Sequence, residues 1–370
     1  MTDYSKFLVV FLLSFLTCAI LVVSRRYYMP RLRARDDLSA CQALHCDETP
    51  RLGGIGIMLA MTLAMTIMPQ SLERLFGIFA LSLAPVVFTG LAEDLGYRVS
   101  PKGRLFAAVV SSLVMITALS VWIPPSSGIA VIDFVLQFAI IAVPLTVLWA
   151  TGICHGFNLI DGVNGLSAGL ALMIATGLWW IADASGAREL ALLSAALIPA
   201  LLGFMLFNWP YGRIFLGDAG AYGIGHLLVW FAILLAWALP DISILALALM
   251  FFWPVADTFL AIWRRRYLGA PVDAPDRLHF HQFVFRILAQ TVGKRMSARA
   301  VNSLTGLVLL PLAGMPVVAA VVLRDAPYLA AAAWVGFGIL FVVCYVWGIA
   351  QFRGRKFRGA RPEFHVHPAE

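Results

Sequence analysis

Charged residues are scarce in this chain. Asp, Glu, Lys and Arg make up 13% of its 370 residues, whereas hydrophobic residues make up 61%. The mean hydropathy of +0.87 lies far above that of soluble proteins. The net charge is +7, but the basic residues sit in short loops beside apolar runs and form no nucleic-acid-binding patch. The composition predicts an all-α, polytopic integral membrane protein.

Cysteine is scarce as well, with 5 residues in the chain. Two of them fall inside apolar runs, and the other three fall in loops that we expect in the cytoplasm, where thiols stay reduced. We therefore expect no disulfides. Cys41, His45 and Cys46 lie close together in sequence, but they do not make up the four ligands of a structural zinc site.

Apolar runs long enough to cross about 30 Å of hydrocarbon recur about eleven times in the sequence. We expect membrane spans at residues 7–23, 53–68, 75–92, 105–123, 131–150, 165–182, 190–207, 222–239, 242–263, 301–323 and 328–350. The first run lacks a small-x-small cleavage site and continues into Arg25 and Arg26, so we interpret it as a retained anchor. The chain then divides into a transmembrane domain, 1–350, and a basic tail, 351–370.

The distribution of Lys and Arg predicts the orientation of these spans. Counted over alternate loops, 23 of the 27 Lys and Arg residues fall on one side of the membrane. By the positive-inside rule that side is the cytoplasm, which puts the N-terminus outside and the C-terminus inside. Almost every unusual polar residue lies in the cytoplasmic loops, so we expect function to face the cytoplasm.

The segment FNLIDGVNGLSAG, residues 157–169, is polar and lies between two apolar runs. Asn158, Asp161 and Asn164 recur every three residues, and on a tight turn this spacing brings their oxygen atoms near one point. The apolar helix predicted after Gly165 begins here, and helix N-termini favour anions. The alternative interpretation is an ordinary helix cap and turn.

Three further segments carry isolated acidic residues. Glu93 and Asp94 close one span, Asp218 lies between glycines where another begins, and Asp257 lies inside an apolar run. Acidic residues facing lipid are costly, so we expect these to face a polar site or pair with a neighbour. The repeat of an acid on glycine-rich backbone at a helix start, at Asp161 and Asp218, predicts one shared site.

Taken together, these motifs resemble the bacterial polyprenyl-phosphate N-acetylhexosamine-1-phosphate transferases, a superfamily that includes phospho-N-acetylmuramoyl-pentapeptide transferase. The matching segments are TPRLGG, EDLGYRVSPK, FNLIDGVNGL, FLGDAGAYGIG, PVAD and DRLHFHQ, at residues 49–54, 93–102, 157–166, 215–225, 254–257 and 276–282. Three positions depart from the family pattern: Glu93 stands where Asp is usual, Gln282 where a further His is frequent, and Ala221 where Ser is usual.

The resemblance implies transfer of N-acetylhexosamine 1-phosphate, with GlcNAc the first choice of sugar, from a UDP-sugar to undecaprenyl phosphate. UMP is released, in the first membrane step of a cell-surface polysaccharide pathway. It assigns catalysis to Asp94, Asp161 and Glu93, metal binding to Asp218 and Asp161, and substrate binding to Asn158, Asn164, Lys102, Arg277, His279, His281 and His45. Oxygen ligands beside a diphosphate favour Mg²⁺, with Mn²⁺ as the alternative ion.

The implied location is the bacterial cytoplasmic membrane, with the active site facing the cytoplasm and no nucleic-acid partner; a homodimer is left open. Two other functions remain. One is a phospho-N-acetylmuramoyl-pentapeptide transferase, and the other is a transporter of anionic lipid or sugar. A transporter favours charges at mid-membrane and broken helices in paired halves, and the sequence shows no internal repeat.

Overall fold

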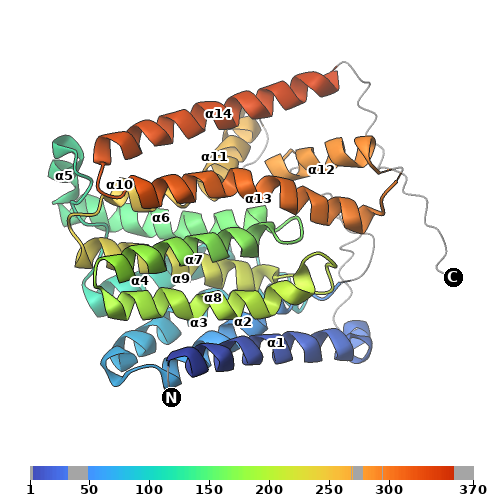
Figure 1. Cartoon of the computed structure of the whole chain (residues 1–370), viewed down its shortest axis with the longest axis horizontal. Coiled ribbons are helices and arrows are strands. Elements are labelled where there is room, and N and C mark those ends of the chain that lie inside the picture. The colour runs from blue at the N-terminus through green and yellow to red at the C-terminus, as the bar shows by residue number, and fades with distance from the viewer. Residues whose placement is uncertain (1–2, 32–48, 268, 270–277, 294, 354–370) are drawn as a thin grey trace.

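The computed structural model describes residues 3–31, 49–267, 269, 278–293 and 295–353, and all of its regular elements are helices. Figure 1 shows the long helices running side by side, from α1 at one edge to α14 at the other. The helices are α1 (Asp3–Tyr28), η1 (Met29–Arg31), α2 (Gly53–Ile67), η2 (Gln70–Leu72), α3 (Glu73–Asp94), α4 (Pro101–Leu119), α5 (Ala130–Leu136), α6 (Ala139–Ile160), α7 (Leu166–Ala184), α8 (Arg188–Asn208), α9 (Gly217–Ala238), α10 (Ile244–Leu249), α11 (Phe252–Tyr267), α12 (Phe280–Thr291), α13 (Ala298–Val322) and α14 (Pro327–Arg353).

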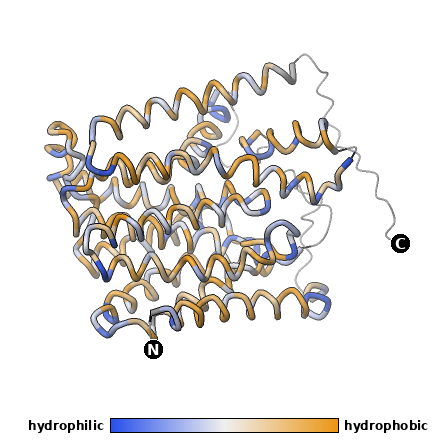
Figure 2. Tube along the Cα trace, in the orientation of Figure 1, coloured by the Kyte–Doolittle hydropathy of each residue, from blue (hydrophilic) through white to orange (hydrophobic). Residues whose placement is uncertain are grey.

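Nine helical segments in the described ranges are long and apolar enough to cross a membrane. The polar residues gather toward the helix ends, and the middle of each long helix is mostly apolar (Figure 2). Backbone groups in hydrocarbon must pair within the protein, and a helix achieves this within one segment. The prediction of an all-α, polytopic membrane protein is therefore confirmed.

Two of the eleven expected spans are not single long helices. The span expected at 53–68 is α2, which has 15 residues, fewer than the roughly 20 that cross a bilayer. The span expected at 242–263 is divided into α10 and α11. Pro254 lies in the first turn of α11; it has no N–H to donate, and its ring would clash with the carbonyl four residues earlier. One uninterrupted α-helix through this position is therefore disfavoured.

One other expected boundary differs in the structure. The span expected at 131–150 is mainly α6, which ends at Ile160, so Asn158 belongs to the last helical turn rather than to a loop. Between the expected spans at 242–263 and 301–323 lies the short helix α12, which ends at Thr291. Ser297 then caps α13 by accepting a hydrogen bond from the N–H of Ala300.

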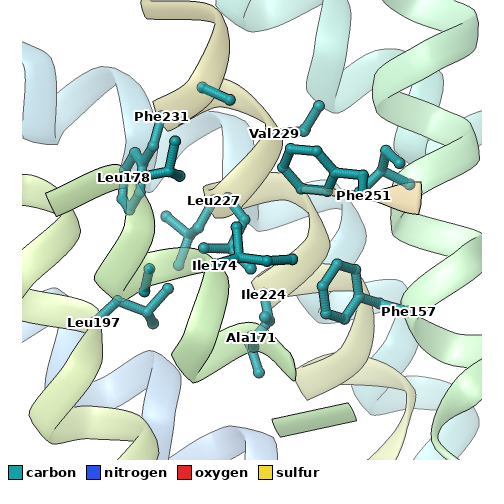
Figure 3. Packing of buried hydrophobic residues seen from close by; sticks show 14 of the residues in the cluster. Phe157, Ala171, Ile174, Leu178, Leu197, Ile224, Leu227, Val229, Phe231 and Phe251 are labelled. Atoms are coloured by element: carbon teal, nitrogen blue, oxygen red, sulfur yellow. The ribbon is translucent and has the colours of Figure 1, made fainter. Parts of the chain in front are cut away.

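The centre of the bundle is α9, nearly all of whose residues are buried. It packs most extensively against α3 and α6. Figure 3 shows its side chains Leu227 and Phe231 beside Ile174 and Leu178 of α7, and Ile224 beside Phe157 of α6. A helix that is apolar on every side needs such full enclosure. The ends of α9 are thereby fixed relative to the helices around it.

Small residues at the start of α9 allow close helix packing. A Cβ on Gly54 of α2 would lie 2.3 Å from the Cα of Gly220, and one on Gly90 of α3 would lie 2.5 Å from the backbone nitrogen of Ala219. Such contacts leave no room for a side chain, and small residues are the usual means of bringing membrane helices together. The first turn of α9 is therefore packed tightly between α2 and α3.

Candidate active site

The ends of α3 and α6 and the start of α9 bring three acidic residues together. Asp94 is the last residue of α3, Asp161 directly follows α6, and Asp218 is in the first turn of α9. The Asp94 carboxylate accepts hydrogen bonds from the backbone N–H groups of Asp218, at 2.9 Å, and Ala219, at 3.0 Å. A carboxylate here satisfies donors that the helix itself leaves unpaired.

Asp218 is the most heavily engaged carboxylate of the three. Its Oδ2 accepts a hydrogen bond from Arg104 at 2.7 Å, and its Oδ1 accepts from Asn158 at 3.0 Å and from Arg51 at 3.3 Å. The Asp218 side chain is almost fully buried. Two positive charges beside it offset the cost of burying the negative charge.

Asp161 lies in the turn between α6 and α7, directly after the last residue of α6. Burial raises the pKa of the Asp161 carboxyl well above its usual range; Arg51 opposes this rise, and the charges of Asp218 and Asp94 add to it. The three acidic residues expected to share a site therefore do lie together, within electrostatic reach of one another.

Two arginines of this cluster were absent from the predicted site residues. Arg51 is in the segment TPRLGG, and Arg104 is in the first turn of α4, two residues after Lys102. Lys102 is exposed on the same turn. The sequence signal was present, because the basic residues lie inside matched or adjoining segments, but only the helix packing shows which side chains face Asp218.

Asn164 points away from the acidic cluster. Its backbone N–H donates to the side chain of Asn302, at 2.8 Å, and its Nδ2 donates to Ser303 Oγ, at 3.0 Å. Gly165, which follows, has a φ of +80° and donates its N–H to Asn208. Asn164 therefore hydrogen-bonds the turn to α13, whereas Asn158 is the asparagine that hydrogen-bonds Asp218.

Glu93 also has a structural contact. Its carboxylate accepts a hydrogen bond from the backbone N–H of Val99, which closes the turn between α3 and α4.

Tyr222 lies one helical turn after Asp218 and contacts Asn158. Its hydroxyl donates to Asn158 Oδ1 at 3.5 Å, and its ring packs on His155, 5.0 Å away. These contacts orient Asn158 from the side opposite its bond to Asp218.

The predicted histidines lie next to the acidic turn. A Cβ on Gly162 would fall 2.1 Å from His281 Nε2, so the imidazole lies directly against the residue after Asp161. His279 stacks on His281 with ring centroids 5.8 Å apart. Burial lowers the pKa of His281 to about 4, so it is neutral near pH 7 among its protein neighbours. His45 and Arg277 lie outside the described residues.

The site combines hard oxygen donors with guanidinium groups. In the described ranges, no three His, Cys, Asp or Glu side chains are arranged as a ready-made metal site. Asp161 and Asp218 could still contribute one or two carboxylates to an ion that completes its shell with water and phosphate, as Mg²⁺ does. The Nε–H of Arg104 is buried without a partner in the described part of the chain, so it is a donor left over for an anion.

These features define a polytopic membrane protein with a buried, charged site where several helices end. The model of glycosyl transferase family 4 matches residues 76–236 of this chain, the part that carries Asp94, Asp161 and Asp218. The family expected from the sequence motifs is therefore confirmed.

Three relatives are similar over much of their length. The probable undecaprenyl-phosphate N-acetylglucosaminyl 1-phosphate transferase of Bacillus subtilis is 27% identical over 79% of this chain and 80% of its own. The decaprenyl-phosphate N-acetylglucosaminephosphotransferase of Mycobacterium tuberculosis is 29% identical over 66% of this chain and 67% of its own. The phospho-N-acetylmuramoyl-pentapeptide-transferase of Clostridioides difficile is 29% identical over 50% of this chain and 61% of its own.

Proposed function

We propose that this protein transfers GlcNAc 1-phosphate from UDP-GlcNAc to undecaprenyl phosphate and releases UMP. The observation that carries the proposal is the meeting of Asp94, Asp161 and Asp218 with Arg51 and Arg104 at the ends of membrane helices. The family match and the names of relatives that act on polyprenyl phosphates support the substrate class. The product would begin a cell-surface polysaccharide on the cytoplasmic membrane of a bacterium.

The proposed topology has eleven spans, with α2 as a short span and α10 with α11 as a broken one. The N-terminus lies outside and the C-terminus in the cytoplasm, as the distribution of Lys and Arg indicates. A lipid phosphate held in the inner leaflet and a soluble nucleotide would then reach the same side. Labelling of single cysteines placed at Ser71 and Ser100, in opposite interhelix segments, tests this arrangement.

In the proposed mechanism the polyprenyl phosphate oxygen attacks the β-phosphorus of the nucleotide, and the bond to the UMP oxygen breaks. Asp218 and Asp161 would hold Mg²⁺, which when bound would offset the charge that builds on the diphosphate. Arg104, whose Nε–H has no partner among the described residues, would donate to a phosphate oxygen. Arg51 would balance the carboxylates, and His279 and His281, together with Arg277, would contact the nucleotide.

Asp94 is the proposed base for the lipid phosphate, and its contacts suggest a second role. Both its carboxylate oxygens accept backbone N–H groups at the start of α9. A phosphate monoester has a second pKa near 6, so most of it carries no proton at pH 7. Positioning Asp218 through the first turn of α9 is therefore a role that Asp94 performs whether or not it moves a proton.

The deciding experiment is UMP release by the purified full-length chain with undecaprenyl phosphate and UDP-GlcNAc. We expect release to require both substrates, to stop when EDTA removes divalent ions, and to return with added Mg²⁺. Asp218→Asn should abolish it. Failure to release UMP from any UDP-N-acetylhexosamine under these conditions would refute the proposed activity. Release that does not depend on Mg²⁺ would refute the proposed metal requirement.

A second substrate is favoured by one observation, the similarity to the Clostridioides difficile phospho-N-acetylmuramoyl-pentapeptide-transferase. The same assay with UDP-N-acetylmuramoyl-pentapeptide in place of UDP-GlcNAc separates the two. Turnover of the muramoyl nucleotide alone would assign the chain to the peptidoglycan reaction.

A further inference from the structure

Asp257 is a buried acid whose hydrogen bonds both reach the histidine segment. It lies in α11 and is 1% exposed. One carboxylate oxygen lies 2.8 Å from His279 Nδ1, and the other accepts the backbone N–H of Phe280 at 3.0 Å. A buried carboxylate is tolerated when its oxygens are satisfied in this way. His279 caps α12 without a side-chain bond of its own, so Asp257 acts as the cap from another helix.

A second helix, α14, also contacts this segment, residues 278–280. The hydroxyl of Tyr345, in α14, donates to the carbonyl of Leu278 at 3.0 Å, and Arg264 of α11 donates to that hydroxyl at 2.8 Å. The Phe280 ring packs against Trp253 of α11 and Phe341 of α14, at 5.1 and 5.0 Å between centroids. Residues 278–280 are thus fixed from both α11 and α14.

These contacts leave one atom of His279 unused. Because Nδ1 faces a carboxylate, its proton is directed there, and Nε2 is the nitrogen left for another partner. Nε2 is buried and makes no hydrogen bond in the described part of the chain. The ring stacks on His281, and His281 lies against Gly162, next to Asp161. The unused nitrogen therefore belongs to the ring pair that borders the acidic cluster.

We propose that Asp257 is a positioning residue for nucleotide binding: it orients His279 so that Nε2 meets the diphosphate of the UDP-sugar. This inference rests on the proposed function for the identity of the nucleotide. With a proton on each ring nitrogen, Nδ1–H donates to Asp257 and Nε2–H donates to a phosphate oxygen. The sequence motif contains the histidines, but Asp257 acts only through His279.

The test measures equilibrium binding of radiolabelled UDP-GlcNAc and UDP to the full-length chain in lipid nanodiscs, without lipid phosphate. We expect Asp257→Asn to raise both Kd values by about tenfold. In a His279→Asn background the same change should alter Kd by less than about twofold, because the two residues act as one unit. A loss of equal size in both backgrounds would show that Asp257 only packs, and would overturn the proposal.

Two further variants keep the test decisive. Tyr345→Phe retains the Asp257 carboxylate and removes one hydroxyl bond to the segment, so it should weaken nucleotide binding by about threefold even if Asp257→Asn fails to fold. Unchanged binding in that folded variant contradicts the proposed fixing of residues 278–280. Asp133→Asn is the matched control: Asp133 accepts the N–H groups of Ser127 and Gly128 beside α5, and nucleotide binding should not change.

The two proposals fail differently. A wild type that binds UDP-GlcNAc but never releases UMP with undecaprenyl phosphate refutes the proposed function and leaves the coupling of Asp257 to His279 measurable. A wild type that releases UMP normally, with additive effects of the two substitutions, refutes the positioning role alone. A loss of binding confined to UDP-GlcNAc, with UDP unaffected, overturns the diphosphate contact.

Discussion

The carboxylate of Asp94 accepts a hydrogen bond from the backbone N–H of Asp218, 2.9 Å away, in the first turn of α9. A residue at the end of α3 thereby determines where the most engaged acid of the site lies. The same carboxylate also receives the next N–H along the chain, that of Ala219. Loss of Asp94 should therefore disturb Asp218 even before any proton transfer is considered.

Asp94→Asn is expected to lower kcat for UMP release by about 100-fold across the range from about pH 6.5 to pH 9. An amide has one oxygen, so it can accept only one of the two backbone N–H groups, and the start of α9 shifts. The measurement is kcat against pH, with detergent-stable folding checked by thermal unfolding. Recovery of near-normal kcat above about pH 8 would instead indicate that Asp94 mainly accepts a proton from the lipid phosphate.

Arg104→Gln is expected to reduce kcat/KM for undecaprenyl phosphate by at least about 30-fold. It removes the charge held 2.7 Å from Asp218 and the Nε–H that no described residue accepts. Arg98→Gln is the matched control. Arg98 is an exposed arginine in the loop just before α4, and its loss should change kcat/KM by less than about twofold. Equal effects of the two substitutions would mean that bulk positive charge, not the Arg104 contact, is what matters.

Gly162→Ala is expected to reduce activity by about tenfold or more while the protein stays folded. The added Cβ would lie 2.1 Å from His281 Nε2, so the imidazole must move away from the acidic turn. Gly152→Ala, in α6, is the control, since a Cβ there meets nothing within 4 Å and alanine is the better helix former. UMP release and the Tm of both variants are to be compared. An unaltered rate in Gly162→Ala would show that the His281 position is not needed.

The acid sensitivity of the fold should depend in part on His281. Its pKa in the folded protein is about 4, lowered mainly by burial, whereas an unfolded histidine has a pKa near 6.5. Between these values the unfolded chain binds a proton that the folded chain does not, so the free energy of unfolding falls as the pH falls. We expect a lower Tm at about pH 5 than at about pH 7, and a smaller difference in His281→Asn. An identical pH dependence in the variant would contradict this assignment.

The sequence by itself determined the class of the fold and the members of the acidic cluster. Long apolar runs leave helices as the simplest way to pair backbone groups in lipid, and acids on glycine-rich turns such as Asp161 and Asp218 stand out against that background. The sequence motifs also identified the family. The break between α10 and α11 was not predicted, and proline alone does not locate it, because Pro85, Pro144 and Pro199 lie inside continuous helices.

Only the tertiary structure decided which side chains face one another. Asn158 and Asn164 have the same chemistry and lie six residues apart, yet one reaches Asp218 and the other binds α13, because the end of α6 separates their directions. Arg104 reaches Asp218 while Lys102 is exposed, since the two lie on different faces of the first turn of α4. The partnership of Asp257 and His279 joins two residues that lie 22 positions apart in the chain. Such pairings depend on how the helices pack, which local sequence patterns do not encode.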